Sequence, residues 1–490
     1  MNKPLHRSVI MIGLAMLFGC AVGPDYTRPK VAVPVAFKEL KGWKQAQPRD
    51  QEIAAQWWMV FNDPLLNTLE ARVTLSNQSL AQAEARYRQA LALVQGARAN
   101  YFPQVAATAA FTRSRPAGNN STIGTDTTNQ HQLSLNAGWE IDIWGRVRRQ
   151  VESSTASAQA SAADLQALRL SLQAEVAQDY FLLRTLDAQK KNLDDTVAAY
   201  QKALELTTNR YAAGVAAKVD VVLATTQLRT AQAQAIDIGV QRSQLEHAIA
   251  LLIGKAPADF SIPAAPVSTT LPQIPAVIPS ELLERRPDVA SAERAMAAAN
   301  AQVGVAKAAY YPALTLSASM GYQNASLANL FAAPSFFWAL GPAALAQTLF
   351  DGGARNAQTA QAVAAYEATV AAYRQTVLAS FQQVEDNLST LRILEDEAQV
   401  QGEAVNSARE SVVLTTNQYK AGIISYLNVI TTQSIALANE RTALGIRGQR
   451  LTAAILLIKA LGGGWNASEL ATADPMAGKQ AMPPRVAAAP

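Results

Sequence analysis

Two neighbouring stretches of this chain lack almost every residue that normally ends a helix. Residues 146–213 contain neither Pro nor Gly, and residues 215–253 contain no Pro and one Gly, Gly239. Because an α-helix rises 1.5 Å per residue, the first stretch alone would extend about 100 Å. Gly214 separates the two stretches and can take the left-handed conformation that ends a helix. The sequence therefore predicts a very long helical hairpin over residues 146–254, with its turn at 211–215.

The same pattern occurs a second time in the chain. The break at residues 211–214 recurs at 419–422, an offset of 422 − 214 = 208 residues. Upstream, residues 101–103 (Tyr-Phe-Pro) match 310–312 (Tyr-Tyr-Pro), and downstream Gly254 matches Gly462. A repeat this long indicates a duplication rather than a solenoid, whose units usually have 20–50 residues. The repeated unit is a helix, two strands and a long helical hairpin.

Between the first helix of each unit and its hairpin, the hydrophobic period changes to two. Apolar side chains from Leu133 to Ile143 alternate with polar ones, which predicts strands with one apolar and one polar face. We place the strands at 102–115, 131–144, 312–322 and 337–350. The last alternates poorly, and we place it by analogy with the equivalent strand of the first repeat, 131–144. A half-buried strand of a soluble sandwich would alternate in the same way. Aromatic residues near the strands favour a membrane interface. They are Tyr101, Phe102, Trp139, Trp144, Tyr310, Tyr311 and Trp338.

Four strands are too few to enclose a water-filled lumen, because about eight are needed for the smallest barrels. An open sheet edge is not tolerated in lipid. If the strands lie in a membrane, several chains must therefore close one ring.

The N-terminus has the features of an export signal. Lys3 and Arg7 precede an apolar run over residues 9–18, which ends at Gly19-Cys20. Residues 17–20 (Leu-Phe-Gly-Cys) resemble a lipobox, so we expect cleavage after residue 19 and a covalent lipid on Cys20. An ordinary signal peptide with an incidental Cys is the alternative.

The remaining boundaries follow from Pro and Gly. The expected segments are a signal peptide (1–19), a lipidated extended arm (20–63), the first repeat (64–255), a Pro-rich linker (256–280), the second repeat (281–462) with its hairpin at 354–461 and turn at 419–423, and a disordered tail (463–490).

Composition gives little support for enzymatic or nucleic-acid chemistry. The formal net charge is only +4, so no strongly basic surface is indicated. The chain has 3 His and 1 Cys, and we find no paired metal-ligand spacing, nucleophile elbow or phosphate-binding Gly loop. We therefore expect no enzyme, no metal and no cofactor apart from the lipid.

Several motifs together resemble the TolC-like outer membrane factors, and most closely the NodT subfamily of efflux lipoproteins. These motifs are Cys20 followed by Gly-Pro-Asp-Tyr at 23–26, Trp57-Trp58, Asp-Pro-Leu at 63–65, the stretch 282–289 (Leu-Leu-Glu-Arg-Arg-Pro-Asp-Val), and Phe-Asp-Gly-Gly at 350–353. The resemblance implies a homotrimer whose 12-stranded transmembrane β-barrel continues into a 12-helix periplasmic α-barrel. It also implies a place in the Gram-negative outer membrane, a periplasmic membrane-fusion adaptor and an inner-membrane pump of the resistance-nodulation-division type.

The resemblance also assigns roles at the two turns. The residues implied at the periplasmic tip, where the adaptor docks, are Arg210, Tyr211, Ala213, Gly214, Val215, Tyr419, Ala421 and Gly422. Those implied at the aperture are Asp220, Ile423, Ile424, Tyr426 and Asn428. Relatives often carry an Asp just beyond the second turn, and this chain does not, so the resemblance implies an apolar or Tyr-lined aperture here. Tyr211 and Tyr419 could instead pack against their own turns.

We expect the function to be that of a passive exit duct for small molecules such as drugs or toxic compounds. The alternative is a periplasmic coiled-coil scaffold or adaptor lipoprotein without a pore, which would not need four alternating strands. The identity of the cargo does not follow from the residues.

Overall fold

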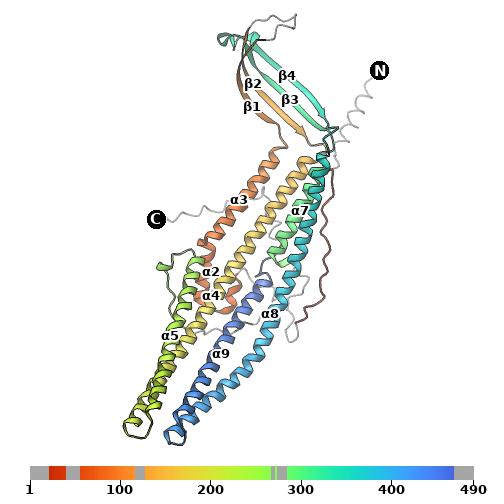
Figure 1. Ribbon diagram of the computed structural model, residues 1–490. Helices are drawn as coiled ribbons and strands as arrows, with labels where there is room; N and C mark the ends of the chain where they lie inside the picture. The colour runs from red at the N-terminus through yellow and green to blue at the C-terminus, as the bar shows by residue number, and fades with distance from the viewer. Residues whose placement is uncertain (1–20, 40–55, 116–126, 266–270, 273–283, 468–490) are drawn as a thin grey trace. The chain divides into compact units, whose positions relative to one another are not determined.

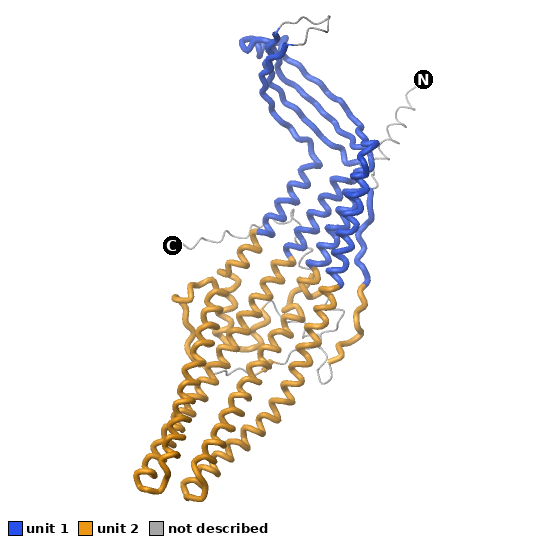
Figure 2. The backbone as a smooth tube through the Cα atoms, viewed as in Figure 1, with its two compact units in different colours: residues 1–30, 86–162, 291–374 blue, residues 31–85, 163–290, 375–490 orange. Residues whose placement is uncertain are grey.

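The computed structural model describes residues 21–39, 56–115, 127–265, 271–272 and 284–467. The expected signal peptide, Cys20 and most of the expected tail lie outside these residues. The chain divides into two compact units (Figure 2). Unit 1 comprises residues 1–30, 86–162 and 291–374, and unit 2 comprises 31–85, 163–290 and 375–490. Among the described helices, none has the length and hydropathy that a membrane crossing requires.

Unit 1 contains a four-stranded antiparallel sheet in the order β1-β2-β3-β4 (Figure 1). The strands are β1 (Gln104–Ser114), β2 (Thr128–Ile141), β3 (Ala313–Asn324) and β4 (Phe336–Ala346). Each expected strand is present, with ends that differ by a few residues; β4 ends at Ala346 rather than at residue 350. Neighbouring strands pair in sequence order, which leaves β1 and β4 as the two edges of the sheet.

The register explains why β4 alternates poorly in the sequence. Met320 pairs with Trp338 and Ala318 with Leu340, but the next pair is Leu316 with Ala343 because the register shifts between Leu316 and Ala318. The shift adds one residue to β4 at Gly341–Pro342, so its apolar positions change from even to odd numbers there. Once this irregularity is included, β4 has one continuous apolar face like the other three strands.

The first residues of the arm have no regular secondary structure and pack within unit 1. The N–H of Val22 donates to the carbonyl oxygen of Trp144 at 3.0 Å. Gly23 lies so close to Gly304 that a Cβ on Gly23 would be 2.5 Å from the Gly304 Cα. Arg149 then binds Asp25 at 2.7 Å, so the arm is held by contacts that depend on its Gly-Pro-Asp-Tyr sequence.

The helices repeat as the duplication predicts. The first repeat has α2 (Pro64–Ser76), α3 (Gln78–Ala99), α4 (Arg146–Ala212) and α5 (Lys218–Leu252). The second has α7 (Pro287–Ala308), α8 (Ala354–Lys420) and α9 (Tyr426–Ala460). The two hairpins have equal helix lengths, 67 and 35 residues in each repeat.

Two details of the helices were not expected from the sequence. The first helix of repeat one is broken at Asn77, whose side chain caps α3 through the N–H of Leu80 at 3.0 Å and donates to the carbonyl of Leu252 at 2.7 Å. The chain also stays packed beyond Gly462, because Trp465 is buried against Ala163 and Ala290. A tail beginning at residue 463 is therefore wrong as far as Ala467; later residues lie outside the described part.

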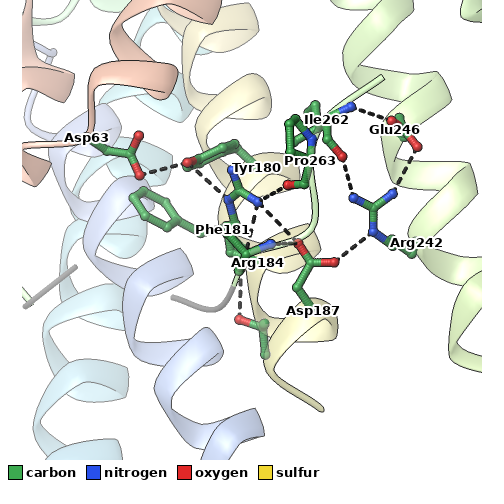
Figure 3. Close-up of polar contacts among 11 residues, drawn as sticks. Asp63, Tyr180, Phe181, Arg184, Asp187, Arg242, Glu246, Ile262 and Pro263 are labelled. Atoms are coloured by element: carbon green, nitrogen blue, oxygen red, sulfur yellow. Dashed lines mark hydrogen bonds and ion pairs between the residues drawn. The ribbon is translucent and has the colours of Figure 1, made fainter. Parts of the chain in front are cut away.

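A buried ionic cluster in unit 2 joins α4 to α5 (Figure 3). The Asp187 carboxylate accepts from Arg184 on its own helix at 3.2 Å and from Arg242 on α5 at 2.7 Å. Arg242 also binds Glu246 at 3.0 Å. Buried charges are tolerated when they are paired and fully hydrogen-bonded. Each charge in this cluster has at least one partner of opposite sign.

The same cluster holds the start of the Pro-rich linker, which begins with a short 3₁₀ turn, η2 (Pro257–Asp259). Arg242 donates to the carbonyl of Ile262 at 2.6 Å, and Arg184 donates to that of Pro263 at 2.7 Å. The N–H of Ala265 donates to Asp187 at 3.0 Å. We call the four charged residues and these three backbone groups the linker clasp. The linker is thus fixed where it leaves the first repeat.

Substitution of Asp187 should release the linker. Asp187→Asn leaves the buried Arg184 without a counter-charge and the half-buried Arg242 with Glu246 alone, and breaking a buried pair in this way costs about 3–5 kcal/mol. We expect faster proteolysis within residues 256–272 and a lower urea midpoint. Asp195→Asn is the matched control, because the exposed pair Lys191–Asp195 contributes only about 0–1 kcal/mol. Equal protease resistance of the two variants would contradict the role of the clasp.

Candidate functional site

The two hairpin turns of unit 2 have the same backbone hydrogen bonds. In the first, the N–H of Val215 donates to the carbonyl of Arg210 at 2.8 Å, and Gly214 has a φ of 73°. In the second, the N–H of Ile423 donates to the carbonyl of Gln418 at 3.0 Å, and Gly422 has a φ of 78°. This six-residue closure with a left-handed residue is the Schellman motif, which satisfies carbonyls at a helix end. The predicted helix-ending role of both glycines is confirmed.

Arg210 connects the two turns directly. Its Nη1 donates to the carbonyl oxygen of Lys420 at 3.0 Å, and its guanidinium lies 4.9 Å from the centroid of the Tyr419 ring. The carbonyl belongs to the last residue of α8, where the helix dipole favours a positive charge. One side chain of the first hairpin therefore binds the end of the second by charge, hydrogen bonding and a cation–π contact.

Beneath this contact lies a small apolar cluster that includes the two tyrosines on either side of the second turn, Tyr419 and Tyr426. Tyr419 and Tyr426 are 4% and 2% exposed, and their ring centroids are 5.2 Å apart. They pack with Ala224 of α5 and Val429 of α9. The pKa of the Tyr426 hydroxyl is raised to about 12, mainly by burial. The nearby Tyr419, Tyr200 and Asp220 raise it by smaller amounts. The expectation that Tyr426 lines an aperture is wrong for this chain, because its ring is enclosed between the hairpins.

The outer surface of the turns is apolar and exposed. Val215 is 65% and Ile423 72% exposed, at equivalent positions after the two glycines. Tyr211, 43% exposed, lies under the ammonium of Lys218 at 5.3 Å rather than in the cluster. Its equivalent, Tyr419, packs inward. The two tyrosines therefore make different contacts, although each lies three residues before the glycine of its turn.

The other expected aperture residues are at the starts of α5 and α9. Asp220 lies in the first turn of α5 and is half-buried, and Asn428, its equivalent in α9, is exposed and donates to Ser425 Oγ at 3.2 Å. Ile424 packs against the apolar cluster. Ala213 and Ala421 are exposed in the turns. Of the expected aperture set, Ile423 and Asn428 have exposed side chains.

The expected interfacial aromatics lie at both ends of the sheet in unit 1. Tyr101 and Phe102 precede β1, Tyr310 and Tyr311 precede β3, and Trp144 follows β2. Trp144 stacks on Tyr311 at 4.7 Å, and Trp139 donates to the carbonyl of Tyr101 at 3.0 Å. Trp338, the third residue of β4, is near the opposite end, where the ring centroids of Tyr322 and Phe336 are 5.5 Å apart. Two aromatic belts, one at each interface, are typical of transmembrane strands.

In the described part of the chain, no group of three or more His, Cys, Asp or Glu side chains could hold a metal ion. The tip offers packing and recognition surfaces and no nucleophile–base pair.

Comparison with known proteins identifies the family. The model of the outer membrane efflux protein family matches residues 71–255 and 278–463, which correspond to the two repeats. The chain belongs to the outer membrane efflux protein family. It is a transport duct of the outer membrane and not an enzyme.

Relatives and solved structures agree with this assignment. The toluene efflux pump outer membrane protein TtgC of Pseudomonas putida is 30% identical over 454 residues, which cover 92% of this chain and 94% of that one. The pyoverdine export outer membrane protein OpmQ of Pseudomonas aeruginosa is 31% identical over 471 residues, 94% of this chain and 97% of that one. The structure of the outer-membrane channel OprN superposes with a TM-score of 0.86 at 28% identity, over 91% of this chain and all of that one.

These findings confirm the resemblance to TolC-like outer membrane factors and the fold class, a mainly helical chain with a duplicated strand-strand-hairpin unit that forms a trimeric outer-membrane channel. They also favour the channel over the pore-less scaffold. As a member of this family, the chain is the outer-membrane component of an efflux system that includes further components.

The contact of Arg210 with the second hairpin gives a direct test of the tip. Arg210→Ala removes a hydrogen bond from a charged donor and a cation–π contact, together worth about 1–3 kcal/mol. We expect the turns to separate, measured as a longer and broader spin-label distance between Ala213→Cys and Ala421→Cys. Arg229→Ala, which removes an exposed Arg from α5 bonded only to Gln232 of its own helix, should leave that distance unchanged. An unchanged distance in Arg210→Ala would show that the apolar cluster alone holds the hairpins together.

Proposed function

We propose that the three copies of this channel close a single duct by pairing β4 of each copy with β1 of the next. The observation that carries this proposal is the sheet itself, which has one continuous apolar face and two edges without a partner strand in the described chain. In hydrocarbon every backbone N–H and C=O needs a partner, so these edges require closure. Three copies of four strands make twelve, enough to surround a water-filled lumen.

The long hairpins of unit 2 would form the periplasmic part of the duct. Three copies supply six hairpins, two from each chain, and these would surround a periplasmic tunnel whose end is formed by the turns at Gly214 and Gly422. The exposed apolar residues Val215 and Ile423 occupy equivalent positions, so the six turns would present six similar surfaces. We propose that these surfaces bind a periplasmic membrane-fusion adaptor.

We further propose small organic molecules as the cargo and a resistance-nodulation-division pump as the energy source. TtgC and OpmQ are named for toluene efflux and pyoverdine export, both of them small molecules. In the described residues the duct has no site for driving transport itself, so the energy must come from a partner. A lipid on Cys20 would attach the arm to the same membrane.

Neighbouring substitutions on β2 test the membrane placement. Leu135 and Asn136 lie on opposite faces near the middle of the strand. Leu135→Arg should abolish insertion, because Arg on a lipid-facing strand position costs about 2–4 kcal/mol at the bilayer midplane and every copy carries it. Asn136→Arg should insert and form conducting trimers in planar bilayers. The measurements are the trimer content of outer-membrane fractions and single-channel conductance. Equal effects of the two substitutions would contradict a sheet with one lipid-facing side.

A further inference from the structure

The face of the sheet opposite the apolar one carries mainly hydroxyl and amide side chains among its polar residues. Its exposed or half-buried polar positions include Thr108, Thr112, Asn136, Thr315, Ser317 and Ser319. Asn136 donates to Thr108 Oγ1 on the neighbouring strand at 3.2 Å, which confirms that these side chains share one face. Hydroxyl and amide groups of this kind can both donate and accept hydrogen bonds. We call this side of β1–β4 the polar face.

Charge is nearly missing from the described strands. Among the residues of β1–β4, only Arg113 and Glu140 carry a formal charge at neutral pH. Arg113 is in phase with Val105 and Phe111, on the apolar face. Glu140 is on the polar face, and Arg146 at the start of α4 binds both of its oxygens, at 2.9 and 2.6 Å. The polar face therefore has a single carboxylate, which is neutralised by a bidentate partner at the helical end of the sheet.

We propose that the membrane section of this duct does not discriminate between cargo molecules by charge. This inference rests on the proposed function, because it requires the polar face to line the lumen. Rings of charged side chains in a narrow, low-dielectric passage create fields that favour one sign of solute. The polar face lacks such rings. Its hydroxyl groups can rotate to donate to an anion or accept from a cation, so organic molecules of either charge and neutral ones meet the same lining.

A duct with a neutral lining cannot reject, by its charge, a molecule that the partner pump has already selected. Selection by charge would then be made by the pump or at the helical tip, and not in the outer membrane.

Thiol accessibility in the assembled, membrane-inserted protein tests both the neutral lining and the proposed duct. Thr315→Cys puts a thiol on the polar face of β3, and Met320→Cys puts one on its apolar face; both positions are exposed in the isolated chain. Each is treated with a sulfonate-bearing or a trimethylammonium-bearing methanethiosulfonate, and the rates are divided by those of a small free thiol. The unsubstituted protein controls for Cys20, the only native cysteine.

We expect Thr315→Cys to react with both reagents at normalised rates within about twofold of each other, and Met320→Cys to react with neither, since lipid covers it. A normalised preference of about tenfold or more for either sign at Thr315→Cys would overturn the neutral lining, because that is the range that focused fields produce. Reaction at Met320→Cys equal to that at Thr315→Cys would instead overturn the proposed duct. Addition of Ser319→Asp to Thr315→Cys, which introduces one carboxylate per copy on the polar face, should shift the ratio toward the cationic reagent and shows that the assay detects charge.

Discussion

Backbone hydrogen bonding at the edges of the four-stranded sheet is the constraint on which the rest of the structure depends. β1 and β4 have free edges in a sheet whose apolar face is continuous from strand to strand. Such a sheet cannot lie in hydrocarbon alone, because unpaired N–H and C=O groups are costly there. Closure by copies of the same chain satisfies the edges, and the duplicated repeat gives a trimer the six hairpins that continue the passage.

In unit 2, the turns of the two hairpins depend on a few specific contacts. The glycines at 214 and 422 end α4 and α8, and Arg210 joins the two turns through the Lys420 carbonyl and the Tyr419 ring. This contact, worth about 1–3 kcal/mol, joins the two hairpins at their turns. The linker clasp around Asp187 is different, because it is buried and multiply bonded. In unit 2 the clasp fixes the linker, whereas Arg210 and the apolar cluster beneath it join the two turns.

Much of this fold could be predicted from residues alone, because its main signals are local. Gly214 and Gly422 follow long helical runs at equivalent places in the two repeats, and the alternation from Leu133 to Ile143 is regular. The features that could not be predicted depend on partners distant in the sequence. The irregularity at Gly341–Pro342 hides the alternation of β4, and the break at Asn77 depends on a carbonyl of Leu252. Tyr211 and Tyr419 occupy equivalent positions in sequence but differ in burial, because only Tyr419 has Arg210 and Tyr426 beside it.

Crosslinking between the sheet edges tests the central claim, closure by three copies, most directly. Val105 lies near the start of β1 and Leu345 near the end of β4, so the two meet only if β4 of one copy pairs antiparallel with β1 of the next. Within one chain the two edges are three strand spacings apart, about 14 Å. This distance is longer than the reach of a short bismaleimide crosslinker. The double variant Val105→Cys/Leu345→Cys, treated in outer membranes, should yield covalent dimers and trimers and nothing larger. Monomers alone, or a series extending past three copies, would contradict the closed trimeric duct.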